Sequence, residues 1–229
     1  MRQTAQRANS MSEVNGNQQN GSRPIPAATT IIGQKTPMFS ARSTKGPLSM
    51  RDYKGKWVIL FFHPADFTPV CTTEFVSLAK RQAEFDALDV SLVGISVDSV
   101  YAHLAWISFI SQKYNVSIEF PVVEDISMAI AASFGLVNEH SVSTEGVRAC
   151  CFVNPEGIVE AKIHYPMQIG RSIDELLRVQ KALINVRESG MTCPADWQEG
   201  DNMMAYPGNE AQATSMSWLD QALGEFQAK

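Results

Sequence analysis

The chain has 229 residues, of which 45% are hydrophobic and 19% charged, and its formal net charge is −5. This length and composition are typical of one or two globular domains and exclude a disordered or fibrous chain. The acidic balance argues against a nucleic-acid partner. The longest apolar run, Trp57–Phe62, is far shorter than the ~20 residues that a membrane helix needs.

The chain has four cysteines, which are too few for a disulfide scaffold. No Cys-x-x-Cys pair is present to favour a zinc knuckle or a thioredoxin-type dithiol. Cys150 and Cys151 are adjacent in an apolar segment, and packing in a core is the commoner role of such residues. This cysteine usage is typical of a reducing compartment, so we expect a cytoplasmic protein.

Both ends of the chain differ from the middle. Residues 1–30 are rich in Asn, Gln, Ser and Gly, and no apolar stretch follows the first arginines. This pattern predicts a disordered N-terminal extension rather than a signal peptide. Residues 191–229 are acidic and follow the last predicted core helix. We therefore expect one domain at 31–190 and a C-terminal arm that contacts a second subunit.

Between these ends, the hydrophobic pattern alternates between strands and helices. Continuous apolar runs predict buried strands, and apolar residues spaced three or four apart predict helices. The strands are expected at Trp57–Phe62, Val90–Ile95, Phe120–Val123, Val147–Val153 and Ile158–Tyr165. The helices are expected from Cys71 onward, at Tyr101–Lys113, at Ile126–Phe134, and from the Ser172 cap to Gly190.

Local signals connect these elements into a fold. The turn Asn154–Gly157 joins the last two strands as a hairpin, and Ser172–Glu175 has the spacing of a capping box. The second helix carries the apolar residues Leu104, Ile107 and Ile110 at helical spacing. Strand–helix units that end in a hairpin and a helix predict an α/β fold with a mixed central sheet flanked by helices.

The segment His63–Cys71 lies between the first buried strand and the helix that follows it. Thr68 suits the N-cap and Pro69 suits the first helical position, which makes Cys71 the third helical residue. Free backbone N–H groups and the helix dipole stabilise a thiolate there and lower the pKa of the thiol. We therefore interpret Cys71 as a reactive cysteine. The alternative is an inert cysteine packed at a helix start.

The same segment resembles a known family. The pattern Pro64-x-x-x-Thr68-x-x-Cys71 is similar to the active-site motif of peroxiredoxins, and the run from His63 to Glu74 resembles their one-cysteine-like subgroup. Further likenesses follow in order, at Val147-Arg148, at Asn154–Gly157, at Tyr165-Pro166, at Gly170–Glu175, and at Pro194–Trp197 with Gly200, Asp201 and Pro207. The resemblance covers about residues 31–208.

This resemblance implies a thioredoxin-like fold and an antioxidant thiol-dependent peroxidase. Such an oxidoreductase reduces hydrogen peroxide and organic hydroperoxides without metal, haem or flavin. The Cys71 thiolate is then expected to attack the peroxide and become a sulfenic acid. Thr68 would hydrogen-bond the peroxide, and Arg148 would hold the thiolate and the charge that develops on the oxygens. Pro64 would shield the sulfur from water.

Three further residues match the family pattern. Glu74, one turn after Cys71, would orient an arginine, and its alternative is an ordinary exposed acid. Arg171 would join that network, and its alternative is a surface charge. His63 matches a histidine of the subgroup, although a lone histidine is more often a hydrogen-bonded structural residue.

Cys193 lies in a loop after the last core helix. The run from Cys193 to Trp197 is similar to the context of the resolving cysteine in two-cysteine peroxiredoxins, whereas one-cysteine relatives have another residue there. We hypothesise that Cys71 forms an intermolecular disulfide with Cys193 of the partner subunit. The alternative is resolution by an external thiol. Cys150 shares a strand face with Arg148, so it is expected near the same site.

The resemblance also implies partners. These are a peroxide, a thioredoxin-like protein or another thiol reductant, and a second copy of the chain in a homodimer or a decamer. Neither nucleic acid nor a membrane is expected. Two rival functions on the same scaffold remain open: a holdase-like chaperone, and a peroxide sensor that passes its oxidation to another protein.

Overall fold

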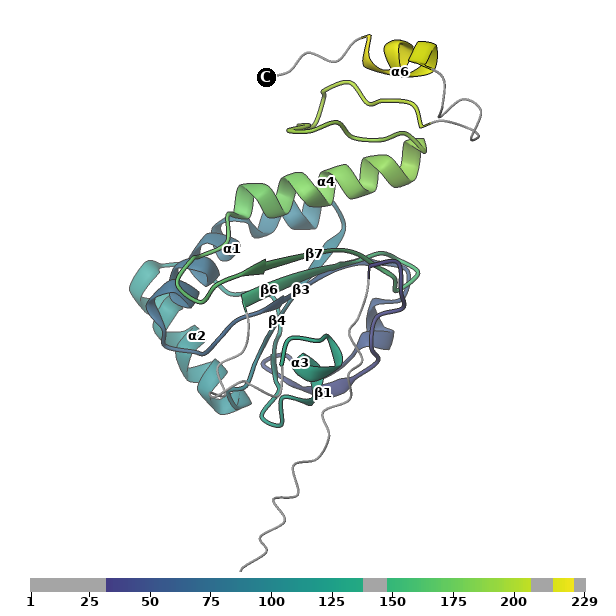
Figure 1. Ribbon diagram of the computed structural model, residues 1–229. Coiled ribbons are helices and arrows are strands. Elements are labelled where there is room, and N and C mark those ends of the chain that lie inside the picture. The colour runs from purple at the N-terminus through teal and green to yellow at the C-terminus, as the bar shows by residue number, and fades with distance from the viewer. Residues whose placement is uncertain (1–31, 138–147, 207–215, 225–229) are drawn as a thin grey trace, which may run out of the picture.

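The computed structural model describes residues 32–137, 148–206 and 216–224. These residues build a mixed seven-stranded sheet with the order β2-β1-β5-β4-β3-β6-β7 (Figure 1). The strands are β1 (Ser40–Ser43), β2 (Gly46–Ser49), β3 (Trp57–Phe62), β4 (Val90–Ser96), β5 (Val122–Glu124), β6 (Arg148–Val153) and β7 (Val159–Tyr165). β3, β4 and β5 run parallel, and the other neighbours pair antiparallel.

Helices cover both faces of this sheet. The helices of the described chain are the short 3-10 helix η1 (Met50–Tyr53) and the α-helices α1 (Pro69–Ala87), α2 (Val100–Tyr114), α3 (Ala129–Ser133), α4 (Ile173–Ser189) and α6 (Met216–Leu223), of which α6 lies away from the sheet (Figure 1). α1, α2 and α4 pack on one face, and α3 and η1 pack on the other. The predicted α/β architecture with a mixed sheet is confirmed.

β3 is the strand on which both halves of the core meet. All six of its residues are buried, and alternate side chains enter the two opposite core layers. Because successive side chains point to opposite faces, a strand covered on both sides needs a continuous apolar run. Cys150 and Cys151 on β6 follow the same rule, since Cys150 packs beneath the α1 layer and Cys151 packs in the α3 layer.

Most predicted elements are confirmed within a few residues. α1 begins at Pro69, with Cys71 as its third residue, and β6 and β7 form the predicted hairpin. The helix expected at Ile126–Phe134 is shorter, because Met128 adopts a left-handed φ of 58° and α3 begins only after it. The β1–β2 hairpin and α6 were not predicted from the sequence.

Of the three apolar residues noted on α2, Ile107 and Ile110 pack on the core and Leu104 does not. Leu104 is 46% exposed, whereas His103 and Trp106 are fully buried together with Ile110. Hydropathy alone places a leucine inside in preference to a histidine. A buried histidine is stable only when its ring nitrogens have partners, and tertiary structure supplies those partners.

The predicted capping box of α4 is only half formed. The Ser172 hydroxyl accepts a hydrogen bond from the backbone N–H of Glu175 over 3.3 Å. The Glu175 carboxylate does not return to the cap but pairs with Arg178, one turn later on the same helix. The Glu175 side of the box is therefore replaced by an ion pair with Arg178, which also contacts the C-terminal arm.

The described part of the C-terminal arm lies along α4 (Figure 1). A backbone bridge joins Thr192 to Met204, and the Trp197 side chain is buried at 2% exposure. Arg178 on α4 donates to the carbonyl oxygen of Trp197 over 3.3 Å. The extension predicted at 1–30 lies outside the described residues. Within the described ranges, every helix is too short or too polar to cross a bilayer.

Candidate functional site

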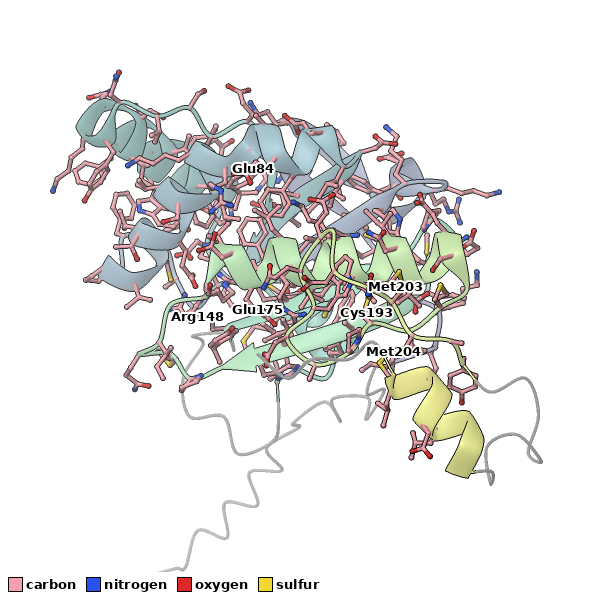
Figure 2. All side chains as sticks on the ribbon, turned by 90° about the horizontal axis from the view of Figure 1, so that it is seen from above. Glu84, Arg148, Glu175, Cys193, Met203 and Met204 are labelled. Carbon is pink, nitrogen blue, oxygen red and sulfur yellow. The ribbon has the colours of Figure 1, made fainter. Side chains whose placement is uncertain are left out.

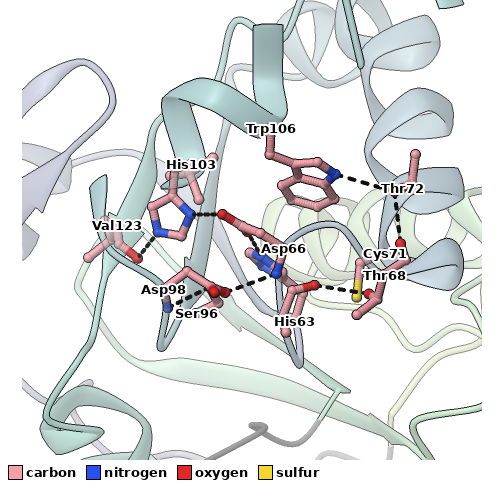
Figure 3. Close-up of polar contacts among 12 residues, drawn as sticks. His63, Asp66, Thr68, Cys71, Thr72, Ser96, Asp98, His103, Trp106 and Val123 are labelled. Carbon is pink, nitrogen blue, oxygen red and sulfur yellow. Dashed lines mark hydrogen bonds and ion pairs between the residues drawn. The ribbon is translucent and has the colours of Figure 1, made fainter. Parts of the chain in front are cut away.

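The candidate site lies where β3 ends and α1 begins. The connecting loop, His63–Thr68, follows the buried strand directly, and Cys71 occupies the first turn of α1 (Figure 3). Phe67 in this loop has a positive φ of 57°, which an L-residue adopts at some cost, so surrounding contacts must hold the bend. The Cys71 side chain is fully buried.

Arg148 is the first residue of β6, and its guanidinium reaches the Cys71 thiol. Nη1 lies 3.6 Å from the Cys71 Sγ, and Nη2 donates to the carbonyl oxygen of Met167 over 2.9 Å. The Nε–H group is buried and has no hydrogen-bond partner among the described residues. An unpaired buried donor is costly, so this N–H is a ready site for a ligand oxygen.

Glu74 lies between two buried arginines. Its Oε2 accepts from Arg148 Nη1 and, over 2.6 Å, from Arg171 Nη2. Its Oε1 accepts from the Nε and the backbone N–H of Arg171, over 2.8 and 2.7 Å. The alternatives of an exposed acid and a surface arginine are wrong, because Glu74 is 3% and Arg171 6% exposed. Two cations share one anion, which leaves an excess positive charge next to Cys71.

Thr68 stands at the N-cap of α1 but does not cap it with its side chain. Its hydroxyl donates instead to the carbonyl oxygen of Ala65 over 2.9 Å. The oxygen lone pairs therefore stay available to accept a hydrogen bond from a ligand. The backbone oxygen of Thr68 accepts from the Thr72 hydroxyl over 2.7 Å, and Pro64 is buried in the same loop. These contacts fix the turn that leads into Cys71.

A buried polar network that the sequence did not reveal lies on the α2 side of this loop (Figure 3). Asp66 accepts from His63 Nε2 over 2.9 Å through one oxygen and from His103 Nδ1 over 2.7 Å through the other. The ligand atoms of these residues lie within 4.8 Å of one another, as metal ligands would. Both carboxylate oxygens already bind imidazole nitrogens, whereas the buried Nδ1 of His63 has no hydrogen-bond partner among the described residues. Burial lowers the pKa of His63 despite its bond to Asp66.

The other three cysteines have different surroundings. Cys150 lies 3.6 Å from Arg171 Nη1, but burial raises the pKa of its thiol, and burial raises that of Cys151 to about 12. Both thiols are packed in the core, on opposite faces of β6. Cys193 is partly exposed, with its Sγ 3.9 Å from the carbonyl oxygen of Ala182 on α4. Figure 2 shows Cys193 well apart from Arg148, the side chain that contacts Cys71.

Comparison with known sequences identifies close relatives. The model of the AhpC/TSA family matches residues 32–162. Peroxiredoxin 2 of Thermoplasma acidophilum is 46% identical over 169 residues, which cover 74% of this chain and 84% of that protein. A peroxiredoxin of Methanocaldococcus jannaschii is 44% identical over 174 residues, covering 75% of this chain and 80% of that protein.

Solved structures that resemble this chain are also peroxiredoxins, and they share its thioredoxin-like fold. The reduced 2-Cys peroxiredoxin of Plasmodium vivax has a TM-score of 0.70 at 33% identity, and the match covers 76% of this chain and 92% of that one. A yeast mitochondrial 1-Cys peroxiredoxin, whose thiol is resolved through glutathione/thioredoxin systems, has a TM-score of 0.73 at 32% identity, with 86% and 94% covered. The similar structures thus include both recycling types.

The shared carboxylate gives a prediction about stability. Glu74→Gln removes the only anion between two buried guanidinium groups, so the free energy of unfolding should fall by about 3 kcal/mol in urea titration. Glu84→Gln is the matched control, because Glu84 lies on the same helix but pairs with Arg81 at the surface. It should have little effect. Equal unfolding midpoints for the two variants would contradict the assigned role of Glu74.

Proposed function

The chain belongs to the AhpC/TSA family of peroxiredoxins, which makes it a thiol-dependent peroxidase, and we propose that Cys71 is its peroxide-attacking nucleophile. The thiolate attacks the terminal oxygen of hydrogen peroxide or an organic hydroperoxide. The O–O bond breaks, Cys71 becomes a sulfenic acid, and hydroxide or alkoxide leaves. The observation that supports this most directly is the guanidinium of Arg148, 3.6 Å from the Cys71 sulfur.

In this proposal, Arg148 and Thr68 bind the reacting peroxide. The unpartnered Nε–H of Arg148 donates to a peroxide oxygen, while Nη1 stays next to the Cys71 sulfur. The same guanidinium thus contacts the sulfur, which loses negative charge, and the peroxide oxygen, which gains it. Thr68 accepts the peroxide O–H, because its own proton is held by Ala65. Pro64 excludes water from the sulfur.

Glu74 and Arg171 act as positioning residues. Glu74 fixes the direction of the Arg148 guanidinium through Nη1, and Arg171 fixes Glu74 through both carboxylate oxygens. Arg171 also donates to the carbonyl oxygens of Phe62 and Ala149 over 3.0 and 3.1 Å. These bonds fix Arg171, and through Glu74 also Arg148, to the end of β3 and the start of β6. His63 contributes through Asp66 and not by direct contact with peroxide.

We propose that Cys193 of the partner subunit resolves the sulfenic acid. Its thiol attacks the Cys71 sulfur, water leaves, and an intermolecular disulfide forms. The partly exposed position of Cys193 and its separation from Arg148 within one chain support attack across an interface. The alternative is resolution by an external thiol, as in the yeast 1-Cys relative.

The remaining parts of the proposal concern assembly and recycling. A dithiol protein such as thioredoxin would reduce the disulfide and return both cysteines to thiols. The chain would act as a homodimer, or as a decamer of such dimers, because an intermolecular disulfide requires a second copy. The four cysteines and the thiol-based cycle favour a cytoplasmic location.

Replacing the nucleophile tests the proposed function. Cys71→Ser should abolish peroxide consumption with any dithiol, because a serine hydroxyl stays protonated and does not attack the O–O bond. Circular dichroism should show an unchanged fold. Cys151→Ala is the control, since that thiol packs on the opposite face of β6, and it should keep full turnover. Substantial residual turnover in Cys71→Ser would reject Cys71 as the nucleophile.

Removing the Arg148 guanidinium should slow the reaction of Cys71 with peroxide. Arg148→Ala should lower the second-order rate constant for peroxide by about 10²-fold, the scale of losing one charged donor. Arg148→Lys should recover only part of this loss, because a point charge cannot contact sulfur and peroxide together. Arg187→Ala, which removes an exposed arginine of α4, is the control and should not change the rate constant. A near wild-type rate constant in Arg148→Ala would remove this residue from the site.

Disulfide formation between variants tests whether Cys193 resolves the Cys71 sulfenic acid. Oxidised wild-type protein should run as a covalent dimer on a non-reducing gel, whereas Cys193→Ser should stay monomeric and accumulate sulfenic acid. A mixture of Cys71→Ser and Cys193→Ser chains should form the dimer through one disulfide, provided peroxide is added. If the wild type and Cys193→Ser gave the same monomeric band and equal turnover with thioredoxin, resolution by Cys193 would be wrong.

A further inference from the structure

α2 contacts the segment around Cys71 at two points. His103 Nδ1 binds Asp66, which lies five residues before Cys71. Trp106, one turn further along α2, donates from Nε1 to the hydroxyl of Thr72 over 3.3 Å. Both α2 side chains are fully buried, and their two partners flank the cysteine (Figure 3). One helix face thus holds the loop before Cys71 and the residue directly after it.

Both ring nitrogens of His103 have hydrogen-bond partners. Nε2 lies 3.2 Å from the carbonyl oxygen of Val123, which can only accept, so Nε2 carries a proton. Burial alone would raise the pKa of Asp66, but bonds from His103 and His63 outweigh it and lower the pKa, so Asp66 is ionised. Nδ1 faces this carboxylate over 2.7 Å. His103 is therefore a buried side chain whose two ring nitrogens contact the ionised Asp66 and the backbone of β5.

Asp66 is also fixed through its backbone. Its N–H donates to Asp98, which follows β4, over 2.9 Å, and the Ser96 hydroxyl donates to the same Asp98 oxygen over 2.8 Å. Asp66 thus connects the loop to α2 through its side chain and to β4 through its main chain. A charge-assisted bond between buried groups is stronger than a neutral one, so the His103 contact resists opening of the loop.

We propose that His103 is a positioning residue of the peroxidase site, which holds the loop His63–Thr68 closed over Cys71 through Asp66 and slows its opening. The proposal rests on Cys71 being the nucleophile. The closed loop keeps Thr68 and Arg148 in place for the attack on peroxide, where small misplacements are costly. The sulfenic acid needs the opposite state, because a fully buried sulfur cannot meet a second thiol until the loop opens.

This role predicts opposite effects on two steps. In a Cys193→Ser parent, the sulfenic acid persists and both steps are measurable in one protein. His103→Gln keeps N–H donors but removes the imidazole ring that contacts both Asp66 and the Val123 carbonyl. It should slow formation of the Cys71 sulfenic acid by about tenfold, followed by mass spectrometry of quenched samples. It should also speed trapping of the preformed sulfenic acid by dimedone severalfold, because the loop opens more often.

Two further variants make the test specific. His164→Gln makes the same substitution at an exposed histidine of β7 and should leave both rates unchanged. Asp66→Asn weakens the contacts to both His63 and His103, so its effects should be at least as large as those of His103→Gln. Adding His103→Gln to Asp66→Asn should change the rates little, because the contact between the two residues is already lost. Circular dichroism and urea unfolding check that each variant is folded.

The outcomes separate this proposal from the function on which it rests. Rates of His103→Gln that match those of His164→Gln overturn it, and so does a fall in both rates together, which indicates general disorder of the site. Additive effects of His103→Gln and Asp66→Asn also overturn it. Failure of the proposed function would appear already in the parent, as absence of sulfenic acid at Cys71, whereas failure of the His103 role appears only in the variants.

Discussion

The arrangement of the site depends on the carboxylate of Glu74 between two buried guanidinium groups. Glu74 lies on α1, Arg148 begins β6, and Arg171 precedes α4, so one anion joins three elements that are distant in the sequence. Taking these charges out of water is expensive unless each is paired and hydrogen-bonded. Glu74 uses both oxygens for this, and Arg171 uses its remaining Nη1 on two strand carbonyls. Cys71 stands one turn before Glu74, so fixing Glu74 also fixes the cysteine against Arg148.

The sheet topology explains why these groups meet where they do. β3 and β4 run parallel, so their carboxyl ends lie at the same edge of the sheet, where α/β folds commonly place functional loops. The loop His63–Thr68 leaves β3 there, and Asp98 follows β4 there and accepts the Asp66 N–H. β6 runs antiparallel to β3, which brings its first residue, Arg148, to that same edge. Opposed strand directions thus bring together a cysteine and an arginine 77 residues apart.

Two cysteines share one face of the sheet and have different chemistry. Cys71 is at a helix start, beside the arginine that carries the uncompensated charge. Cys150 lies within a central strand, where burial raises the pKa of its thiol despite the nearby Arg171. Cys193 is held against α4 by the arm, in which Trp197 is buried and bonded to Arg178. Each thiol therefore has the surroundings that suit a different role: nucleophile, packing residue and candidate resolving thiol.

The sequence by itself determined most of the elements and the nucleophile candidate, because both depend on local patterns. The apolar run at β3, the Thr68-Pro69 helix start and the Asn154–Gly157 turn are short-range signals of backbone conformation. Tertiary structure alone decided which polar residues are buried. Glu74 read equally well as an exposed acid, and no local signal marked His103 as buried, although both are enclosed in the fold. A buried charge is tolerated only where distant residues supply its partners, and no local pattern in the chain records those partners.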